Sequence, residues 1–139
     1  MKQLSTSLIP VSKDSTYNIF VIVKPGFEKI LPEVIKVFEN KGWKLFKIRS
    51  KQLLLSESKK LYDIHKKEDW YEDLCNYMSS GVSTGLIFIK NKPMSPKMFD
   101  ETNKIKDDIR EKWGESEMRN VIHSSDSMDR MQYERGIYF

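Results

Sequence analysis

Two nearly continuous apolar runs constrain the fold of this chain more than any other feature of its sequence. Residues 17–23 read Tyr-Asn-Ile-Phe-Val-Ile-Val, and residues 82–90 contain Leu-Ile-Phe-Ile at positions 86–89. A strand with one face in water alternates apolar and polar residues, whereas a strand buried on both faces is apolar almost throughout. We therefore predict that both runs are β-strands in the middle of one sheet.

The stretch between these two strands begins with a helical pattern. Pro32 suits a first helical turn and Gly42 suits a helix end. Apolar residues recur between them at helical spacing, namely Leu31, Val34, Ile35 and Phe38. Residues 43–55 alternate instead, and the alternation slips phase between Leu45 and Phe46. This slip predicts a second strand that is bulged or lies at the edge of the sheet.

The remaining segments complete a mixed pattern of helices and strands. Ser56 can cap a helix that runs to about His65, residues 71–78 carry another helical stripe, and residues 95–112 fit a helix that Gly114 ends, with a break near Asn103 left open. The aromatic residues within 133–139 predict a final strand. The order of elements predicts an α+β fold, a ferredoxin-like sandwich in which helices pack on a four-stranded antiparallel sheet.

Length and charge limit the domain organisation and the classes of partner. A chain of 139 residues fits one domain, which we assign to residues 17–139, and the polar residues 1–16 form an N-terminal arm or tail. A net charge of +4 favours anionic ligands but is too small to indicate nucleic acid or a membrane. The single cysteine, Cys75, is expected to be a buried thiol. No segment is typical of a transmembrane helix or a secretory signal, so we expect a cytoplasmic protein.

Residues 120–127, Asn-Val-Ile-His-Ser-Ser-Asp-Ser, place His123 after a short apolar run and among small polar residues. A neutral imidazole can act as a nucleophile or a base, provided that a neighbouring acceptor fixes which ring nitrogen is free. Asp126 is close in sequence, and Glu134 could return from a following segment. The alternative interpretation is an ordinary loop histidine, and the spacing alone does not decide between the two.

The same stretch closely resembles the Asn-x-x-His-Gly-Ser-Asp-Ser signature of nucleoside diphosphate kinases, with Ser124 where a glycine is usual. Similarity continues in order along nearly the whole chain, from about Asn18 to Phe139. It is carried by Val23-Lys24-Pro25, Phe38-Glu-Asn-Lys-Gly42, Tyr62, Tyr77-Met-Ser-Ser-Gly81, Thr102-Asn103, Ile109-Arg110, and Glu134 followed by aromatic residues. The resemblance implies the ferredoxin-like fold, a homo-oligomer, and nucleoside di- and triphosphates as ligands.

The resemblance also implies an activity and its residues. His123 would take the terminal phosphoryl group from a nucleoside triphosphate and pass it to a diphosphate in a ping-pong cycle. The other catalytic positions would be Glu134, which orients the ring, Ser125, which supports Glu134, and Lys24 and Tyr62. The nucleotide-binding positions would be Lys24, Trp70, Leu74, Thr102, Arg110 and Asn120. Mg²⁺ would be carried on the nucleotide phosphates, and no cluster has the spacing of protein metal ligands.

Several departures from the family pattern keep a second function open. Gly26 replaces a usual aspartate, Glu68 and Pro96 replace usual arginines, and the segment from Thr102 to Arg110 is short. Lys97, with Lys66 and Lys67, could compensate for the lost charge. The alternative is a nucleotide-binding regulatory module with little turnover. An RNA-binding domain is disfavoured, since neither central strand has the aromatic and glycine pattern of an RNA-binding sheet.

Overall fold

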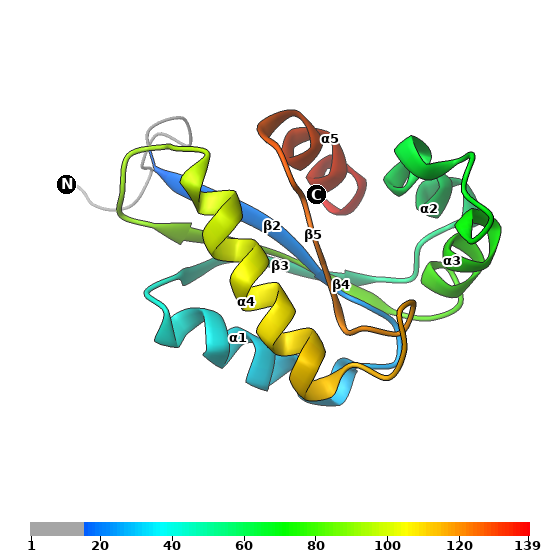
Figure 1. Cartoon of the computed structure of the whole chain (residues 1–139), viewed down its shortest axis with the longest axis horizontal. Helices are drawn as coiled ribbons and strands as arrows, with labels where there is room; N and C mark the ends of the chain where they lie inside the picture. Colours follow the sequence, from blue (N-terminus) through cyan, green and yellow to red (C-terminus); the bar gives the residue numbers. More distant parts are fainter. Residues whose placement is uncertain (1–15) are drawn as a thin grey trace.

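The computed structural model of the chain describes residues 16–139. The predicted N-terminal arm, residues 1–16, lies outside this range except for Thr16. Four strands form one antiparallel sheet, β2 (Tyr17–Val23), β3 (Lys44–Lys51), β4 (Ser83–Lys90) and β5 (Ile122–Ser124), in the order β3-β4-β2-β5 (Figure 1). Both apolar runs are central strands, as predicted, and every residue of β2 is buried.

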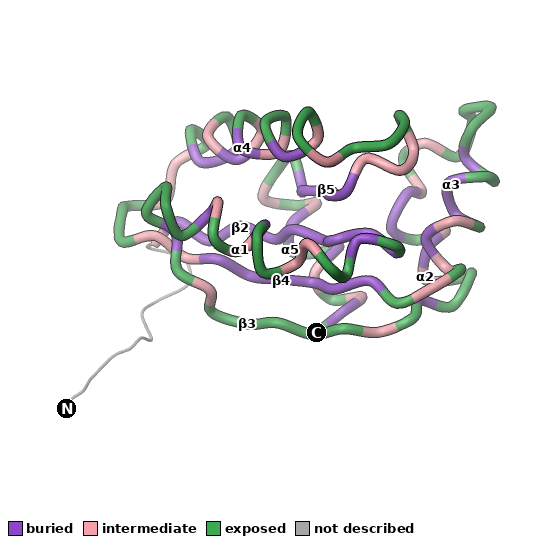
Figure 2. The backbone as a smooth tube through the Cα atoms, turned by 90° about the horizontal axis from the view of Figure 1, so that it is seen from below, coloured by how far each residue is buried: buried purple, intermediate pink, exposed green. Residues whose placement is uncertain are grey.

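Helices cover both faces of the sheet. α1 (Leu31–Asn40) and α4 (Lys97–Trp113) pack on one face, where Phe38 stacks on Phe88 of β4, and α5 (Met128–Tyr138) packs on the other, with Tyr138 against Phe20 of β2 (Figure 1). α2 (Leu55–Leu61) and α3 (Tyr71–Met78) contact each other beside α5. Short 3-10 turns span Glu28–Ile30 and Asp63–His65. Burial concentrates in the central strands and the inner faces of the helices (Figure 2).

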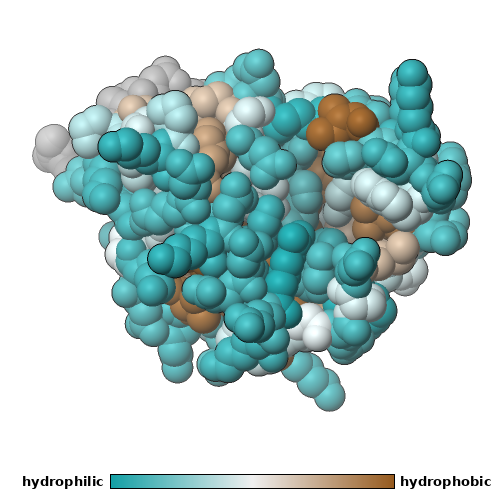
Figure 3. All heavy atoms as spheres, viewed as in Figure 1, coloured by the Kyte–Doolittle hydropathy of each residue, from teal (hydrophilic) through white to brown (hydrophobic). Residues whose placement is uncertain are grey.

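The edge strand β3 has the predicted irregularity. Its pairing with β4 shifts register between Leu45 and Lys47, and it is mostly exposed (Figure 2). Its lysines add to a largely hydrophilic surface, on which the apolar areas of the face in Figure 3 are small and separate. Within residues 16–139, no helix combines the length and the apolar character needed to cross a membrane.

The prediction of a C-terminal strand is wrong. Residues 128–138 form α5, and the last strand is the three-residue β5 around His123. Aromatic residues suggested a strand, but the buried positions Met131, Glu134 and Tyr138 are three and four residues apart, which is helical spacing. Ser127 begins the helix, because its side-chain oxygen accepts a hydrogen bond from the backbone N–H of Arg130 at 3.2 Å.

Two helix boundaries also differ from expectation. Ser56 lies inside α2, whose N-cap position is Leu54, and the Glu57 carboxylate accepts the backbone N–H of Leu54 at 2.9 Å. α4 is one continuous helix without a break at Asn103, and Gly114 ends it as predicted. The continuity of α4 decides which side chains reach the site described next.

Candidate functional site

His123 occupies the edge strand β5, and its pairing sets the direction of its side chain. Its Cα partner on β2 is Ile22, which lies two residues after Phe20 and on the same face of the sheet, the face that α5 covers. The imidazole Nε2 lies 2.8 Å from Oε1 of Glu134 on α5. The histidine side chain is 17 % exposed and the glutamate 4 % exposed. β5 and α5 thus build a largely buried histidine–carboxylate pair.

The carboxylate of Glu134 is held by two further donors. The Ser125 hydroxyl donates to Oε1 at 2.7 Å, and Arg130 Nε donates to Oε2 at 3.1 Å. Arg130 also donates to Asp63 and to the carbonyl of Leu61, which ties α5 to the end of α2. Sequence reasoning identified Ser125 but missed Arg130. Its spacing of four residues from Glu134 becomes informative only when this segment is known to be a helix.

The electrostatics of the pair favour a neutral histidine beside an ionised glutamate. Burial lowers the pKa of His123, although the hydrogen bond and charge of Glu134 oppose this. Burial raises the pKa of Glu134, but the hydrogen bonds from His123 and Ser125 and the charge of Arg130 outweigh it, so the net shift is downward. Nε2 therefore carries the proton that Glu134 accepts, and Nδ1 keeps a free lone pair.

Tyr62 and Ser124 bring two buried hydroxyls to the same region. The Tyr62 ring meets the His123 ring edge-on, with centroids 5.4 Å apart. Within residues 16–139, neither the Tyr62 nor the Ser124 hydroxyl has a hydrogen-bond partner. Burial raises the pKa of Tyr62 well above its usual value, so its hydroxyl stays protonated and can donate to a ligand.

Two predicted cations converge beside the histidine. Lys24, at the end of β2, is 4 % exposed and donates from Nζ to Asn120 Oδ1 at 2.7 Å and to the carbonyl of Met118 at 3.3 Å. Arg110, on α4, donates from Nη2 and Nε to the carbonyl of Ile122 at 2.8 and 3.2 Å. Burial, with the charges of Arg110 and Lys106, lowers the pKa of Lys24 to about 7.

The pocket beside His123 has a volume of about 560 Å³. The predicted site residues on its lining are Lys24, Tyr62, Trp70, Leu74, Arg110, Asn120 and His123. Trp70 is 43 % exposed, lies at the start of α3 and contacts His65, with ring centroids 5.1 Å apart. The pocket therefore joins a half-exposed aromatic platform to a buried, positively charged region around the histidine.

The structure does not bring Thr102 to the pocket. This residue is 1 % exposed, and its hydroxyl donates to the carbonyl of Met98 at 2.6 Å within α4. It does not line the pocket. The short segment from Thr102 to Arg110 forms two turns of continuous helix, which turn Thr102 towards the core.

Lys97, which was expected to compensate for the lost charge, is not brought to the pocket either. Pro96 and Lys97 lie at the start of α4, and neither lines the pocket, nor does the exposed Glu68. Lys97 precedes Lys106 by about 14 Å of helix at 1.5 Å per residue. The further lysine on the lining is Lys106, which sequence reasoning missed. The available signal was its position one turn before Arg110.

Gly26 lies at the turn after Lys24 and has a structural explanation. Its φ of +92° suits glycine, and a Cβ placed there would lie 2.7 Å from Nη2 of Arg119. Arg119 itself lies over the rings of Phe27 and Tyr77. An aspartate at position 26 would therefore require the turn and the Arg119 side chain to move.

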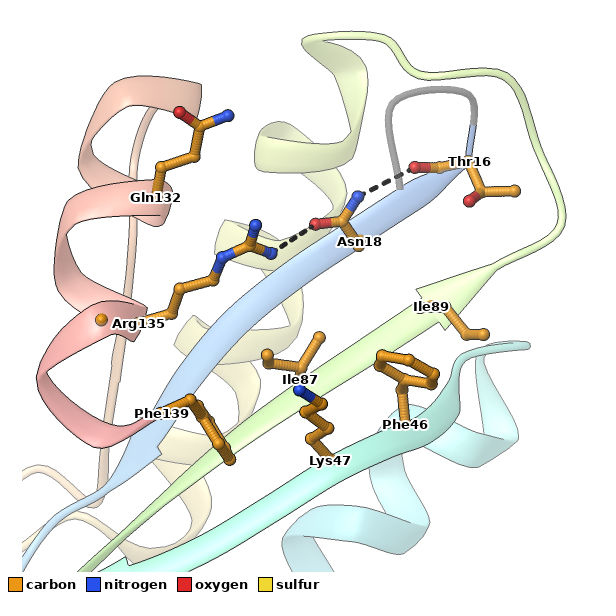
Figure 4. A pocket seen from close by; sticks show the side chains of 10 residues that line it. Thr16, Asn18, Phe46, Lys47, Ile87, Ile89, Gln132, Arg135 and Phe139 are labelled. Carbon is orange, nitrogen blue, oxygen red and sulfur yellow. Dashed lines mark hydrogen bonds between the residues drawn. The ribbon is translucent and has the colours of Figure 1, made fainter. Parts of the chain in front are cut away.

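A second hollow, of about 310 Å³, lies between β3, β4 and α5 (Figure 4). Its apolar lining consists of Phe46, Ile87, Ile89 and Phe139, and Arg135 at its side donates to Asn18 Oδ1 at 3.3 Å (Figure 4). Its lining includes no histidine, cysteine or carboxylate. The reactive groups thus belong to the larger pocket. In the described part of the chain, no group of three or more metal-ligating side chains could hold a metal ion.

Fold and site together define an α+β sandwich protein with a histidine–carboxylate pair at a cationic pocket. A model of the nucleoside diphosphate kinase family matches residues 18–139. The chain belongs to this family of enzymes, in agreement with the resemblance of its sequence.

Similar proteins agree with this assignment. A nucleoside diphosphate kinase of Hyperthermus butylicus is 32% identical, with 86% of this chain and 89% of that protein covered. One of Saccharolobus islandicus is 30% identical, with 86% and 92% covered. The crystal structure of the Aquifex aeolicus nucleoside diphosphate kinase superimposes with a TM-score of 0.74 over 90% of this chain and 96% of that chain at 21% identity, which establishes the shared fold.

Proposed function

We propose that this protein transfers the terminal phosphoryl group of a nucleoside triphosphate to a nucleoside diphosphate through a phosphohistidine at His123. The observation that carries the proposal is the 2.8 Å contact between Nε2 and Glu134, which leaves Nδ1 as the nucleophilic nitrogen beside buried cations. A carboxylate that fixes the tautomer and orients the ring is what a histidine nucleophile requires.

In the first half-reaction, Nδ1 attacks the γ-phosphorus. The N–P bond forms as the bond from phosphorus to the β,γ-bridging oxygen breaks, and the diphosphate leaves with that electron pair. In the second half-reaction, a terminal oxygen of another diphosphate attacks the phosphorus, and the N–P bond breaks to return the free imidazole. Lys24 and Arg110 neutralise charge on the phosphoryl oxygens, and Glu134 stabilises the positive charge that the imidazole acquires.

The nucleoside end of the ligand would lie against Trp70 and Leu74. An exposed indole face stacks on any base, so it favours binding of purines and pyrimidines alike. Glu117 also lines the pocket and is the group available to contact a base edge. We therefore expect a modest range of reactivity among nucleotides with different bases.

Mg²⁺ would arrive with the phosphates of the nucleotide. The pocket lining carries cations and only two carboxylates, Glu117 and Asp126, a donor set that suits anionic phosphates better than a protein-held cation. When bound, the ion would neutralise phosphate charge. The residues of this chain would then act on the nucleotide–magnesium complex.

Residues 17–139 would form the catalytic domain, and we propose that it assembles as a homo-oligomer. The support for assembly is the exposed edge strand β3, on which Phe46 is 53% and Ile48 is 48% exposed. Apolar side chains on an open strand edge are a common surface for pairing with another chain.

The transfer can be tested with γ-labelled ATP. The wild-type protein should acquire acid-labile label and release it to an added unlabelled diphosphate. His123→Ala should acquire none while it still binds nucleotide, because only the nucleophile is removed. His65→Ala is the matched control, since His65 lines the same pocket without contacting Glu134, and it should keep the label. Nucleotide binding without labelling of the wild type would instead support the regulatory module.

A further inference from the structure

Lys106 is the cation of the pocket with the fewest partners. Its side chain is 13 % exposed and its Nζ lies 4.0 Å from Oδ1 of Asp126, whose side chain is 74 % exposed. Lys24 and Arg110 donate hydrogen bonds to acceptors of the protein, whereas Lys106 has no hydrogen-bond acceptor within residues 16–139. A long ion pair with a mostly solvated carboxylate contributes little.

Among the two lysines in the middle of α4, Lys104 and Lys106, only Lys106 is directed towards the pocket. Thr102, Ile105 and Ile109 face the core, and Lys106 and Arg110 follow one another on the flank beside the pocket. The neighbouring Lys104 is exposed and lines no part of the pocket. A flexible lysine on a helix surface normally extends into water, whereas the side chain of Lys106 is only 13 % exposed and lies on the lining of the pocket, where its ammonium can meet a ligand.

The charges around Lys106 indicate the chemistry of that ligand. Burial and the neighbouring charge of Arg110 lower the pKa of Lys106, and Lys106 in turn helps to lower the pKa of Lys24. The pocket lining holds three cations, Lys24, Lys106 and Arg110, and two carboxylates, Glu117 and Asp126, which leaves one positive charge in excess. An anion with several charges would relieve both the repulsion and the lack of hydrogen-bond acceptors.

We propose that Lys106 is a phosphate-binding residue, the third cation of the pocket beside Lys24 and Arg110, and that it favours nucleotides with two or more phosphates. The inference rests on the proposed function, because it takes the pocket to be the nucleotide site. One phosphate can be neutralised by two of the cations. The charge of the third is fully used only when a second phosphate is present.

The test compares three variants with the wild type by calorimetric titration of ADP and of AMP. Lys106→Met keeps the aliphatic stem and removes the charge, Lys106→Arg keeps the charge, and Lys104→Met removes an exposed charge from the same helix. We expect Lys106→Met to weaken ADP binding by about 10- to 100-fold, as for loss of one charged hydrogen bond, and AMP binding by less. Lys106→Arg and Lys104→Met should stay within a few-fold of the wild type.

Thermal unfolding without ligand separates a binding role from a structural one. Lys106→Met should melt no lower than the wild type, because it removes a poorly partnered buried charge. A lower melting temperature together with equal losses for ADP and AMP would overturn the inference in favour of a structural role. If the wild type binds ADP and forms labelled protein but Lys106→Met has unchanged ADP affinity, this inference is overturned and the proposed function still stands. A wild type that neither binds ADP nor becomes labelled would overturn the proposed function, and this inference with it.

Discussion

At the scale of single residues, the proposed phosphoryl transfer depends on how Glu134 holds His123. Glu134→Gln keeps an oxygen that can accept the Nε2 proton but removes the charge that stabilises the phosphorylated ring. A hydrogen bond to a charged group contributes about 1.5–3 kcal/mol, so we expect phosphoenzyme formation to slow by about 10- to 100-fold. Rapid-quench measurement of labelling gives the rate. Asp129→Asn, on the exposed side of the same helix, should label at the wild-type rate.

Lys24 should give the activity and the stability opposite responses to pH. Its pKa is lowered from 10.5 to about 7, so kcat/KM should fall as the pH rises through about 7, because the free enzyme loses a phosphate-binding charge. Above pH 7 the unfolded chain binds this proton more tightly than the folded protein does. The free energy of unfolding should therefore rise between about pH 7 and 10.5.

Lys24→Met tests this prediction in both assays. Urea unfolding at pH 7 and 9 should show the rise in stability for the wild type and a smaller rise for the variant. The activity of the variant should be low at both values, without the decline above neutrality that is assigned to Lys24. A wild-type kcat/KM that increases from pH 7 to 9 would mean that Lys24 acts uncharged or is not needed for phosphate binding.

At the scale of elements, α5 positions Glu134 through its contact with β4. A Cβ on Gly85 of β4 would lie 2.9 to 3.1 Å from three carbons of Tyr138, whereas one on Gly136 of α5 would meet nothing within 4 Å. Gly85→Ala should therefore displace the end of α5, cost about 1–3 kcal/mol of unfolding free energy and slow labelling. Gly136→Ala should stabilise the helix by about 0.5–1 kcal/mol.

This matched pair is measured by denaturant unfolding and by the labelling rate. Both variants add one methyl group, so a difference between them reports the space around each glycine. Equal stability of the two variants would contradict the packing of Tyr138 over Gly85.

The central strands and the helices α4 and α5 show what the sequence could and could not predict. A strand that is buried on both faces has a nearly continuous apolar sequence, so β2 and β4 were predictable. Residues of α5 were not, because aromatic side chains favour strands and the helical spacing of its buried residues includes a glutamate. In α4, the helix was predictable, but the assignment of Thr102 followed a family pattern with a longer segment, and the continuous helix brings Lys106 to the pocket instead.

At the scale of the whole molecule, the site residues come from segments far apart in the chain. His123 was a candidate from its polar setting, and the resemblance to the family implied roles for it and for Lys24 at the end of β2. Arg130 was not predictable, because its role requires α2 and α5 to lie side by side. Motifs thus predicted the candidate groups for the proposed chemistry, whereas the contacts that support these groups depend on tertiary packing.

Assembly is also a property of the whole molecule. We expect the wild type to sediment as more than one chain at micromolar concentration, and Phe46→Lys with Ile48→Lys to shift it towards the single chain, because the exposed edge of β3 loses its apolar side chains. Lys104→Met is a control that leaves this edge intact. A wild type that sediments as a single chain over this range would show that β3 is a solvent-facing edge.

In the proposed mechanism, Nδ1 of His123 carries the phosphoryl group while Nε2 stays hydrogen-bonded to Glu134. Phosphorus NMR of the labelled protein distinguishes the two phosphohistidine isomers, and fragmentation of the phosphopeptide identifies the residue. We expect phosphate on Nδ1 of His123 in the wild type. Phosphate on Nε2, or on any other residue, would contradict it, because the 2.8 Å contact with Glu134 could not then persist through the reaction.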